Sequence, residues 1–279
     1  MTGATGHVGG RVARLLAAAG VEQRLVVRRP ERAPALPGAT VAQASYADGA
    51  AVRDALTGVD VALMVSGAES QDRVAEHRCF VDAAVAAGVG HVVYLSFAGA
   101  AADATFLLAR DHHATERHLE ASGVAWTHLR DNLYLDLLPE LAGVDGVVRG
   151  PAGSGRVAGV SREDVAEAAV AVLRDPASHA GRAYSLTGPD ALTLAEATAT
   201  ISRVLGRPFS FHDETLEQAY ESRAGLGAPP WLVDAWVSTY TAIAAGELDE
   251  VTGDVAHLTG HAPRTLAEVL RPAGPAHTG

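Results

Sequence analysis

Three glycines near the start of the chain have the spacing of a phosphate-binding turn. Gly3, Gly6 and Gly9 recur at every third position, and a helical pattern of apolar residues begins at Val8. In such a turn the first glycine permits the tight bend, the second lets a pyrophosphate approach the backbone, and the third permits close packing of the helix. Free N–H groups at the helix N-terminus would hold the phosphates. The alternative is a purely structural glycine turn.

The turn predicts a dinucleotide site, and the next strand indicates which dinucleotide. We expect cofactor contacts from Thr2, Gly3, Thr5, Gly6, His7 and Val8. NAD-specific sites usually carry an acidic residue at the end of that strand, bound to the ribose 2′-hydroxyl. Arg28 and Arg29 stand in that place, and a guanidinium matches a 2′-phosphate in charge and geometry. We therefore predict NADP(H), against the alternative of a solvated arginine-rich loop.

Small polar residues follow two further apolar runs. Ser66 and Gly67 follow the run 61–65, and Ser96 follows the run 91–95. Ligands of doubly wound sheets bind at the carboxyl ends of strands. We therefore expect Ser66 and Gly67 to line the cofactor channel. For Ser96 we expect a catalytic hydrogen bond to nicotinamide or substrate, with a helix cap as the alternative.

All 22 basic residues are arginine, so the chain contains no lysine. This excludes a lysine Schiff base, a P-loop and a Tyr-x-x-x-Lys catalytic pair. Hydride transfer to a quinone needs little beyond placing nicotinamide against the acceptor, since water can protonate the hydroquinone anion. An unactivated ketone would need a proton donor. The missing pair therefore favours a readily reduced acceptor.

Apolar runs and helical patterns alternate through the first half of the chain. The runs typical of buried parallel strands are 25–27, 41–43, 61–65, 91–95 and 125–129, and the helical stretches are 8–19, 70–87 and 105–121. Later segments predict a helix after Ser161, a strand at 183–186 and a helix at 193–205. The alternation predicts an α/β fold with a Rossmann-like doubly wound parallel sheet.

The order of these patterns suggests two parts. We expect residues 1–130 to form an NADP(H)-binding domain and residues 131–279 a smaller C-terminal α/β substrate lobe, with about 155–190 returning to the sheet. Only Met1 precedes the glycine turn, whereas a buried strand needs roughly five residues. We therefore expect the first strand to be missing from this sequence and the natural start to lie upstream of Met1.

Composition excludes several classes of protein. A length of 279 residues suits one large domain or an α/β core with a smaller lobe, and a net charge of −11 argues against nucleic-acid binding. The single Cys79 excludes an intramolecular disulfide and a multi-cysteine metal site, and we expect no bound metal. No uncharged apolar run reaches roughly 18–20 residues, and we expect no secretory signal because no charged segment followed by an apolar run stands at the N-terminus. We expect a cytoplasmic protein with a small-molecule substrate and no membrane partner, and we allow for a homodimer.

Several segments resemble the NmrA-like, atypical short-chain dehydrogenase/reductase family, and within it the NADPH-dependent quinone oxidoreductase type 2 and triphenylmethane reductase group. They follow in order along nearly the whole chain, at 2–9, 26–30, 84–89, 93–96, 127–134, 155–158, 162–166, 184–189 and 259–266. The resemblance implies a Rossmann-like domain with a smaller substrate lobe, NADPH preference, and reduction of quinones or related conjugated acceptors. Ser45 departs from the family, in which an aspartate often faces the adenine.

Three more site candidates depend on this resemblance. His112 lies on the helix that carries the Tyr/Lys pair in typical relatives, and Glu116 would orient it to donate a proton or bind ribose. Such an i,i+4 pair is also common on a solvated helix face. Asn132 and Tyr134 lie in the segment that resembles the family's pocket lining. We expect Asn132 to bind the cofactor and Tyr134 to act in catalysis, against the alternative of a polar loop pair.

Together these features predict an NADPH-dependent oxidoreductase that transfers hydride to a quinone-like or other conjugated electrophile. Trp231, Trp236 and Tyr240 either roof an apolar acceptor or belong to the core. The alternative function is a non-catalytic NADP(H)-sensing regulator of the NmrA type, because the usual catalytic residues are absent. A sugar-nucleotide epimerase or dehydratase is disfavoured, because those enzymes use the missing tyrosine–lysine pair.

Overall fold

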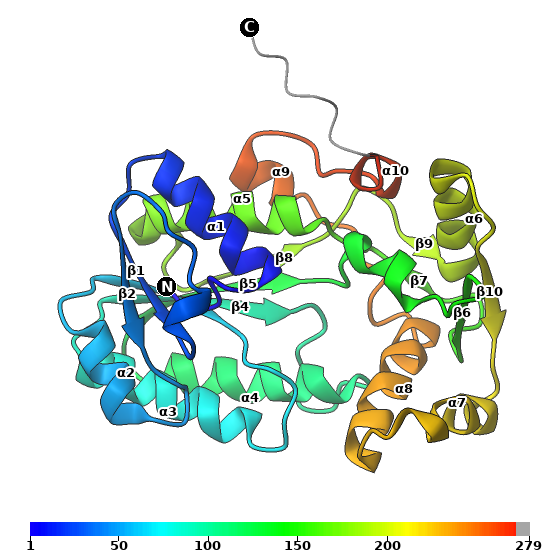
Figure 1. Cartoon of the computed structure of the whole chain (residues 1–279), viewed down its shortest axis with the longest axis horizontal. Helices are drawn as coiled ribbons and strands as arrows, with labels where there is room; N and C mark the ends of the chain where they lie inside the picture. The colour runs from blue at the N-terminus through cyan, green and yellow to red at the C-terminus, as the bar shows by residue number, and fades with distance from the viewer. Residues whose placement is uncertain (272–279) are drawn as a thin grey trace, which may run out of the picture.

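The computed structural model describes residues 1–271 and is built around a parallel β-sheet in two parts (Figure 1). The larger part has the order β3-β4-β5-β8, and the smaller part pairs β1 with β2. The strands are β1 (Gln23–Val27), β2 (Ala39–Gln43), β3 (Val61–Val65), β4 (His91–Phe97), β5 (Ala125–Asp131) and β8 (Arg182–Leu186). The predicted Rossmann-like sheet is confirmed.

The two parts of the sheet are joined by the first two residues of the chain. The carbonyl of Met1 accepts a hydrogen bond from the N–H of Val26 in β1 at 2.9 Å, and the N–H of Thr2 donates to the carbonyl of Leu63 in β3 at 2.9 Å. Within residues 1–271 no strand lies between β1 and β3. The expected gap in the sheet is therefore present, and Met1 and Thr2 hold the glycine turn at its carboxyl edge.

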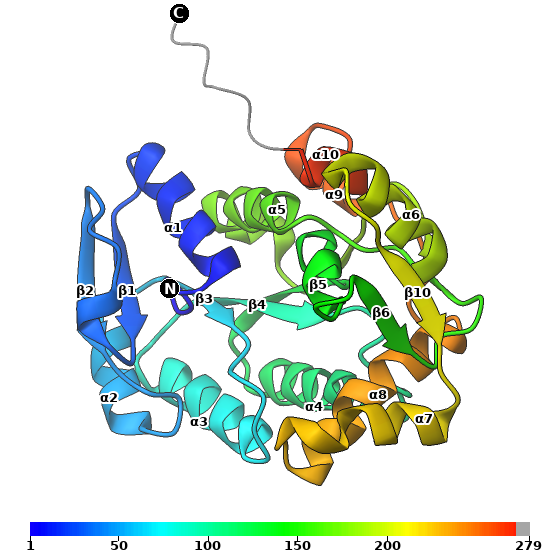
Figure 2. The ribbon, with the colours of Figure 1, turned by 45° about the vertical axis from the view of Figure 1, so that its right-hand side comes forward.

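Helices cover both faces of the sheet (Figure 1, Figure 2). One face carries α1 (His7–Ala18), α5 (Arg162–Arg174) and α9 (Asp254–Thr259), and the other carries α2 (Gly49–Leu56), α3 (Arg73–Ala86) and α4 (Leu107–Ala121). The helix α1 buries Val8, Val12 and Leu16 along one stripe, which packs into a core shared with α5. Burial of that stripe, at about 25 cal/mol per Å² of apolar surface, fixes α1 against the sheet edge.

A smaller lobe is built mainly from the second half of the chain. It contains β6 (Val147–Gly150), β7 (Arg156–Val157), β9 (Leu192–Thr193), α6 (Leu194–Leu205), β10 (Ser210–Asp213), α7 (Leu216–Arg223), α8 (Pro230–Ala244) and α10 (Leu266–Val269). Four short 3-10 turns are η1 (Pro30–Arg32), η2 (Leu135–Leu141), η3 (Pro176–His179) and η4 (Ala224–Leu226). Between η2 and α6 the chain returns to the sheet through α5 and β8. No helix within residues 1–271 has the length and apolar character of a bilayer span.

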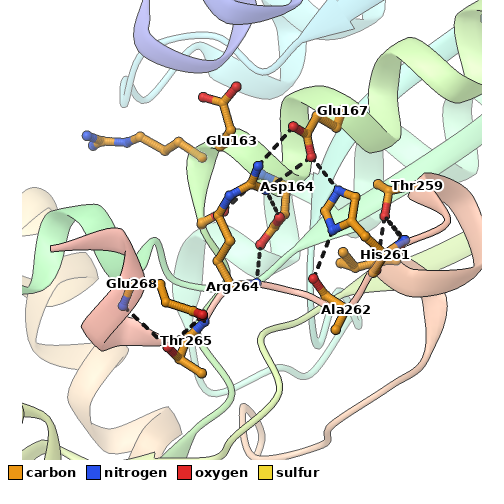
Figure 3. Close-up of polar contacts among 12 residues, drawn as sticks. Glu163, Asp164, Glu167, Thr259, His261, Ala262, Arg264, Thr265 and Glu268 are labelled. Atoms are coloured by element: carbon orange, nitrogen blue, oxygen red, sulfur yellow. Dashed lines mark hydrogen bonds and ion pairs between the residues drawn. The ribbon is translucent and has the colours of Figure 1, made fainter. Parts of the chain in front are cut away.

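An ion-pair cluster fastens the segment between α9 and α10 onto α5 (Figure 3). Arg264 donates from its backbone and its guanidinium to the buried carboxylate of Asp164. The same guanidinium makes two 3.0 Å bonds to Glu167, which also contacts His261 at 2.7 Å. Because α10 packs on α6, this cluster ties the smaller lobe to the helix layer of the sheet.

Candidate active site

A cavity of about 240 Å³ opens at the carboxyl ends of β1 and β3, where the sheet is interrupted. We call it the strand-end cleft. Its lining consists of Thr2, Gly3, Thr5, Val26, Val27, Arg28, Ala44, Ser45, Tyr46, Val65, Ser66, Gly67, Ala68, Ser70 and Glu76. Six residues predicted to bind the cofactor lie together there: Thr2, Gly3, Thr5, Arg28, Ser66 and Gly67.

The three glycines of the turn have different structural roles. Gly3 has φ +70°, in the left-handed region that favours glycine, and its carbonyl accepts the N–H of Gly6 at 2.9 Å. A Cβ on Gly9 would lie 2.3 Å from the carbonyl oxygen of Gly3, whereas one on Gly6 would lie 3.4 Å from it. Gly6 is exposed, and α1 has no acidic residue in its first turn and no side-chain cap. The turn therefore presents free N–H groups beside an open glycine, which suits an anion.

The side chains of Thr2 and Val8 in the turn are less available to a cofactor than the sequence suggested. The Thr2 hydroxyl is buried, lies 2.6 Å from the Tyr46 hydroxyl and accepts the N–H of Val65 at 2.9 Å, so it braces the turn. The Val8 side chain belongs to the core under α1, which leaves only its backbone for a ligand. His7 is exposed in the first turn of α1. Tyr46, which the sequence analysis missed, lines the cleft and fixes Thr2.

The two predicted phosphate-binding arginines lie differently. Arg28 is exposed at the end of β1, lines the strand-end cleft, and has no ion pair within residues 1–271. Arg29 is also exposed, but it stands at the start of η1 and is not part of the cleft lining. Ser45, the departure from the family pattern, lies beside Arg28 in the cleft. The cleft thus carries one arginine without a carboxylate partner, and Arg29 lies just outside the lining.

A second cavity of about 520 Å³, which we call the lobe cavity, lies between the sheet edge and the smaller lobe. Its lining is mostly apolar: Glu69, Phe106, Leu133, Tyr134, Leu137, Leu138, Leu141, Gly143, Val147, Arg149, Leu194, Ser222, Arg223, Leu226, Trp236, Thr239, Tyr240 and Ile243. Trp236 and Tyr240, which the sequence offered as a roof, are in this lining, and Trp231 is not.

The loop after β3 separates and connects the two cavities. Ala68 and Ser70 line the strand-end cleft, while Glu69 between them lines the lobe cavity. The indole N–H of Trp236 in α8 donates to Glu69 at 3.4 Å, which joins the loop to the lobe. A ligand that extends along the cleft past this loop would meet a second ligand in the lobe cavity.

Eight buried or half-buried polar residues form what we call the interior network: Arg73, His77, Tyr94, Ser96, His112, Thr115, Glu116 and Arg130. His77 accepts the N–H of Gly67 at 2.8 Å and contacts Thr115 at 2.9 Å. Burial, with a smaller contribution from Arg73, lowers the pKa of His77 to about 3, so its ring is neutral. The network therefore supports the wall of the strand-end cleft from behind.

The network occupies both ring nitrogens of His112. The Nδ1 atom lies 2.9 Å from the Tyr94 hydroxyl and Nε2 lies 3.0 Å from the Arg73 guanidinium. Because arginine only donates, Nε2 must accept, and burial followed by Arg73 holds the pKa of His112 well below its usual range. Glu116 does not contact His112. The prediction that Glu116 orients His112 toward cofactor or acceptor is therefore corrected.

Ser96 is also part of the network rather than of the crevice. The strand β4 continues to Phe97, and the fully buried Ser96 hydroxyl donates to Glu116 at 2.7 Å. The same carboxylate accepts two bonds from Arg130, at 2.8 and 2.7 Å. The side chain points toward α4, so the predicted bond to nicotinamide or substrate is corrected, and the alternative of a helix cap is also not observed.

Asn132 and Tyr134, three and five residues past the predicted strand run, diverge in the structure. The Asn132 amide donates to the carbonyl of Leu248 at 3.0 Å and accepts the N–H of Leu133 at 2.8 Å. It is buried and ties β5 to the segment after α8, which corrects its assignment to the cofactor. Tyr134 lines the lobe cavity, and its hydroxyl donates to Asp131.

Asp131 is the acidic residue that sequence reasoning passed over. It ends β5, is 5% exposed, and meets the Tyr134 hydroxyl through its carboxylate. Burial raises the pKa of Asp131 to about 7, while the Tyr134 bond and Arg73 oppose that shift. The available signal was a carboxylate placed directly at the end of an apolar strand.

Two clusters in residues 1–271 have ligand spacing suited to a metal ion, namely Glu116–Glu120–His128 and Asp164–Glu167–His261. Each already contains a cation. Arg130 binds Glu116, and Arg264 binds Asp164 and Glu167. These guanidiniums neutralise the carboxylates, so the clusters are accounted for as ion pairs.

Comparison with known proteins identifies the family. Residues 3–176 match a family model described as NAD(P)H-binding. The chain is 39% identical to the (4-alkanoyl-5-oxo-2,5-dihydrofuran-3-yl)methyl phosphate reductase of Streptomyces griseus, covering 96% of this chain and 95% of that protein. It is 35% identical to quinone oxidoreductase 2 of Escherichia coli, covering 96% of each chain.

Solved structures agree with this result. The quinone oxidoreductase QOR2 of Escherichia coli, complexed with NADPH, has a TM-score of 0.88 at 33% identity over 96% of this chain and 97% of that one. Triphenylmethane reductase of Citrobacter sp., complexed with NADP(H), has a TM-score of 0.85 at 29% identity over 96% and 97%. NmrA, at 19% identity and a TM-score of 0.78 over 97% and 93%, shares the fold. The chain therefore belongs to the NAD(P)H-binding family and is an NAD(P)H-dependent oxidoreductase with a Rossmann-like fold.

Proposed function

We propose that this protein transfers hydride from NADPH to a quinone-like or other conjugated acceptor bound in the lobe cavity. The observation that carries the proposal is the loop 68–70, whose Ala68 and Ser70 line the strand-end cleft and whose Glu69 lines the apolar cavity of about 520 Å³. Cavities of this size and lining typically hold small organic ligands. Relatives named as a quinone oxidoreductase, an NAD(P)H azoreductase and a (4-alkanoyl-5-oxo-2,5-dihydrofuran-3-yl)methyl phosphate reductase support conjugated acceptors as a class.

The cofactor would lie in the strand-end cleft with its pyrophosphate on the glycine turn. The free N–H groups of α1 and the exposed Gly6 fit phosphate oxygens, and the unpaired Arg28, with Arg29 beside it, fits a ribose 2′-phosphate. Ser66 and Gly67 would flank the cofactor along β3 toward the lobe cavity. When bound, the nicotinamide supplies hydride. The preference for NADPH over NADH rests on Arg28 and Arg29.

The charges around the lobe cavity favour an uncharged or cationic acceptor. Arg149 is paired with Asp145 at 2.6 Å, and Arg223 is paired with Glu214 at 3.0 Å. Of the three charged residues in the lining, Glu69, Arg149 and Arg223, only Glu69 has no ion-pair partner within residues 1–271. A phosphate ester, such as the substrate named for the Streptomyces relative, would need an unpaired guanidinium there. The proposal therefore favours quinones and dyes over phosphate esters.

Tyr134 is the group in the cavity that we assign as proton donor. Tyr134 lines the cavity, with its hydroxyl bonded to Asp131, whereas Ser96, His112 and Asn132 are bonded to other protein groups and are not in the lining. A conjugated carbonyl develops negative charge on oxygen as hydride adds, and a phenol beside it can transfer a proton. Arg162 stacks on the Tyr134 ring, with its guanidinium carbon 5.2 Å from the ring centre, and holds the ring in place.

The test is a panel of acceptors assayed by NADPH absorbance. Quinones, conjugated enones, azo dyes, triphenylmethane dyes and a butenolide phosphate ester are offered with NADPH and with NADH. We expect turnover of uncharged and cationic acceptors, at higher kcat/KM with NADPH. Cofactor binding without turnover of any acceptor would refute the proposal and favour the non-catalytic NADP(H)-sensing alternative, which at present is supported by shared fold alone.

A further inference from the structure

A buried carboxyl lies directly behind the tyrosine of the lobe cavity. Asp131 is 5% exposed at the carboxyl end of β5, and its carboxylate accepts the hydroxyl of Tyr134, three residues further along the chain. Buried carboxyls are rare unless they are paired with a cation. Asp131 has no ion pair within the part of the chain that the structure describes. Its position therefore calls for an explanation other than a salt bridge.

Charged groups approach the Asp131–Tyr134 pair from three neighbouring elements. Arg73 of α3 faces Asp131, but its guanidinium is bonded to His112 and lies 3.8 Å from Asp111. Arg162 of α5 lies over the Tyr134 ring, and Asp136 of η2 accepts the backbone N–H of Arg162 and acts on Tyr134 through its charge. The strands beside Asp131 present Phe97 and Leu186, which carry no charge.

These surroundings bring the protonated and ionised forms of Asp131 into balance near neutral pH. Burial raises the pKa of Asp131 to about 7, and the pKa of Tyr134 is raised well above its usual value by burial and then by the Asp131 charge. A phenol in that state gives up its proton only if another group replaces the proton at once. Among the groups facing the Tyr134 hydroxyl, the carboxyl of Asp131 is the one in hydrogen-bond contact.

We propose that Asp131 stores the proton that Tyr134 passes to the reduced acceptor. The inference rests on the proposed function and names a residue and a path that the function alone does not require. When Asp131 is ionised, the Tyr134 hydroxyl donates to it. When Asp131 is protonated, the hydrogen bond reverses: the carboxyl O–H donates to the phenol oxygen, and the phenol O–H is free for the acceptor. As the acceptor gains a hydride, its oxygen becomes negative and takes the phenol proton of Tyr134. The carboxyl proton of Asp131 moves to the phenolate oxygen, and the resulting carboxylate is reprotonated by water after the product leaves. The sum is one acceptor, one hydride and one proton giving the reduced acceptor.

The experiment compares acceptors that differ in their need for a proton. A conjugated enone requires one as hydride adds. A quinone requires less assistance because its reduced anion is stable in water, and a cationic triphenylmethane dye requires none because hydride neutralises its carbocation. With Asp131→Asn we expect kcat to fall about 100-fold for the enone, less for the quinone and less than about twofold for the dye. The KM for NADPH should not change.

The matched variants separate proton transfer from positioning. Tyr134→Phe should show the same order of losses across the three acceptors. Asp136→Asn removes the neighbouring carboxylate, which does not touch the Tyr134 hydroxyl, and should leave all three rates unchanged. Thermal unfolding and NADPH binding of each variant report whether the fold is retained. Equal losses on all three acceptors in Asp131→Asn, or an unchanged enone rate, would overturn the proposal.

The pH dependence of the rate is a second, independent test of the Asp131 proposal. In the wild type the rate with a proton-requiring acceptor should fall as pH rises through about 7, because the stored proton is then lost. In Asp131→Asn that fall should be absent. A wild-type profile without it overturns the Asp131 proposal while the oxidoreductase function stands. Failure of the wild type to oxidise NADPH with any acceptor is a different result, and it refutes the proposed function itself.

Discussion

The strand-end cleft and the interior network both contain residues that sequence reasoning selected as functional, yet the fold uses them differently. In the cleft, the Arg28 side chain is exposed and has no ion pair within residues 1–271, and the adjoining glycine turn leaves Gly6 exposed. In the network, Ser96 and His112 are buried and their polar atoms bind other side chains. The two regions lie back to back, joined by the bond from Gly67 to His77. Ligand-binding capacity therefore follows from which groups remain unpartnered.

Burial explains the difference. A polar group removed from water must find a hydrogen-bond partner or cost about 1–3 kcal/mol. Ser96 and His112 lie between β4, α3 and α4, so neighbours from those elements satisfy them. The turn and the end of β1 lie at the sheet edge, where water or a ligand can satisfy them. Three sets of variants test this comparison.

The largest effect is expected within the glycine turn. Gly9→Ala would place a methyl group 2.3 Å from the Gly3 carbonyl oxygen, so the backbone must move at a cost of roughly 2–3 kcal/mol of unfolding free energy. Gly6→Ala has room in the protein and should cost less than about 1 kcal/mol, yet raise the Kd for NADPH about tenfold by blocking phosphate approach. Denaturant unfolding and calorimetry measure both. Unchanged NADPH affinity in Gly6→Ala would show that the pyrophosphate lies elsewhere.

The next effect concerns the arginines at the cleft. Replacing Arg28 and Arg29 together by alanine should weaken NADPH about 10- to 100-fold, as charged hydrogen bonds contribute about 1.5–3 kcal/mol, and NADH by no more than about twofold. Arg28 lines the cleft and Arg29 does not, so Arg28→Ala alone should account for most of the loss. Arg174→Ala, at an exposed position on α5, is the matched control. Equal weakening of both cofactors would contradict the assignment to the 2′-phosphate.

The smallest effect is expected in the network. Ser96→Ala removes one of three hydrogen bonds to Glu116 and should lower stability by about 1 kcal/mol, while kcat/KM stays within about twofold of the wild type. Tyr134→Phe should behave in the opposite way, with little change in stability and a loss of turnover. A large drop in kcat/KM for Ser96→Ala, at unchanged stability, would restore Ser96 to the active site and break the comparison.

Prediction from sequence was good where the signal is local. Alternating apolar runs gave the strands of the sheet, and a cap at Ser161 marked the start of α5 correctly, with its hydroxyl accepting the N–H of Asp164. The short α2 was missed because Gly49 opens it and only Val52 and Leu56 among its eight residues are large apolar side chains that mark a buried face. For Asp131 the local signal was only a carboxylate at the end of a strand. Its contact with the Tyr134 hydroxyl and its burial could not be seen in the sequence, because both depend on the tertiary structure.

The sequence by itself determined the cofactor half of this protein. The glycine turn needs only residues close together in the chain, since Gly3 provides the left-handed backbone that Gly9 packs against. The tertiary structure alone decided which polar side chains stay free, because Glu116, Arg130 and Arg73 reach their partners from different elements. It also determined the position and lining of the lobe cavity, because the lining residues come from segments far apart in the sequence. Backbone geometry is set by neighbours in sequence, whereas hydrogen-bond satisfaction and burial are set by neighbours in space.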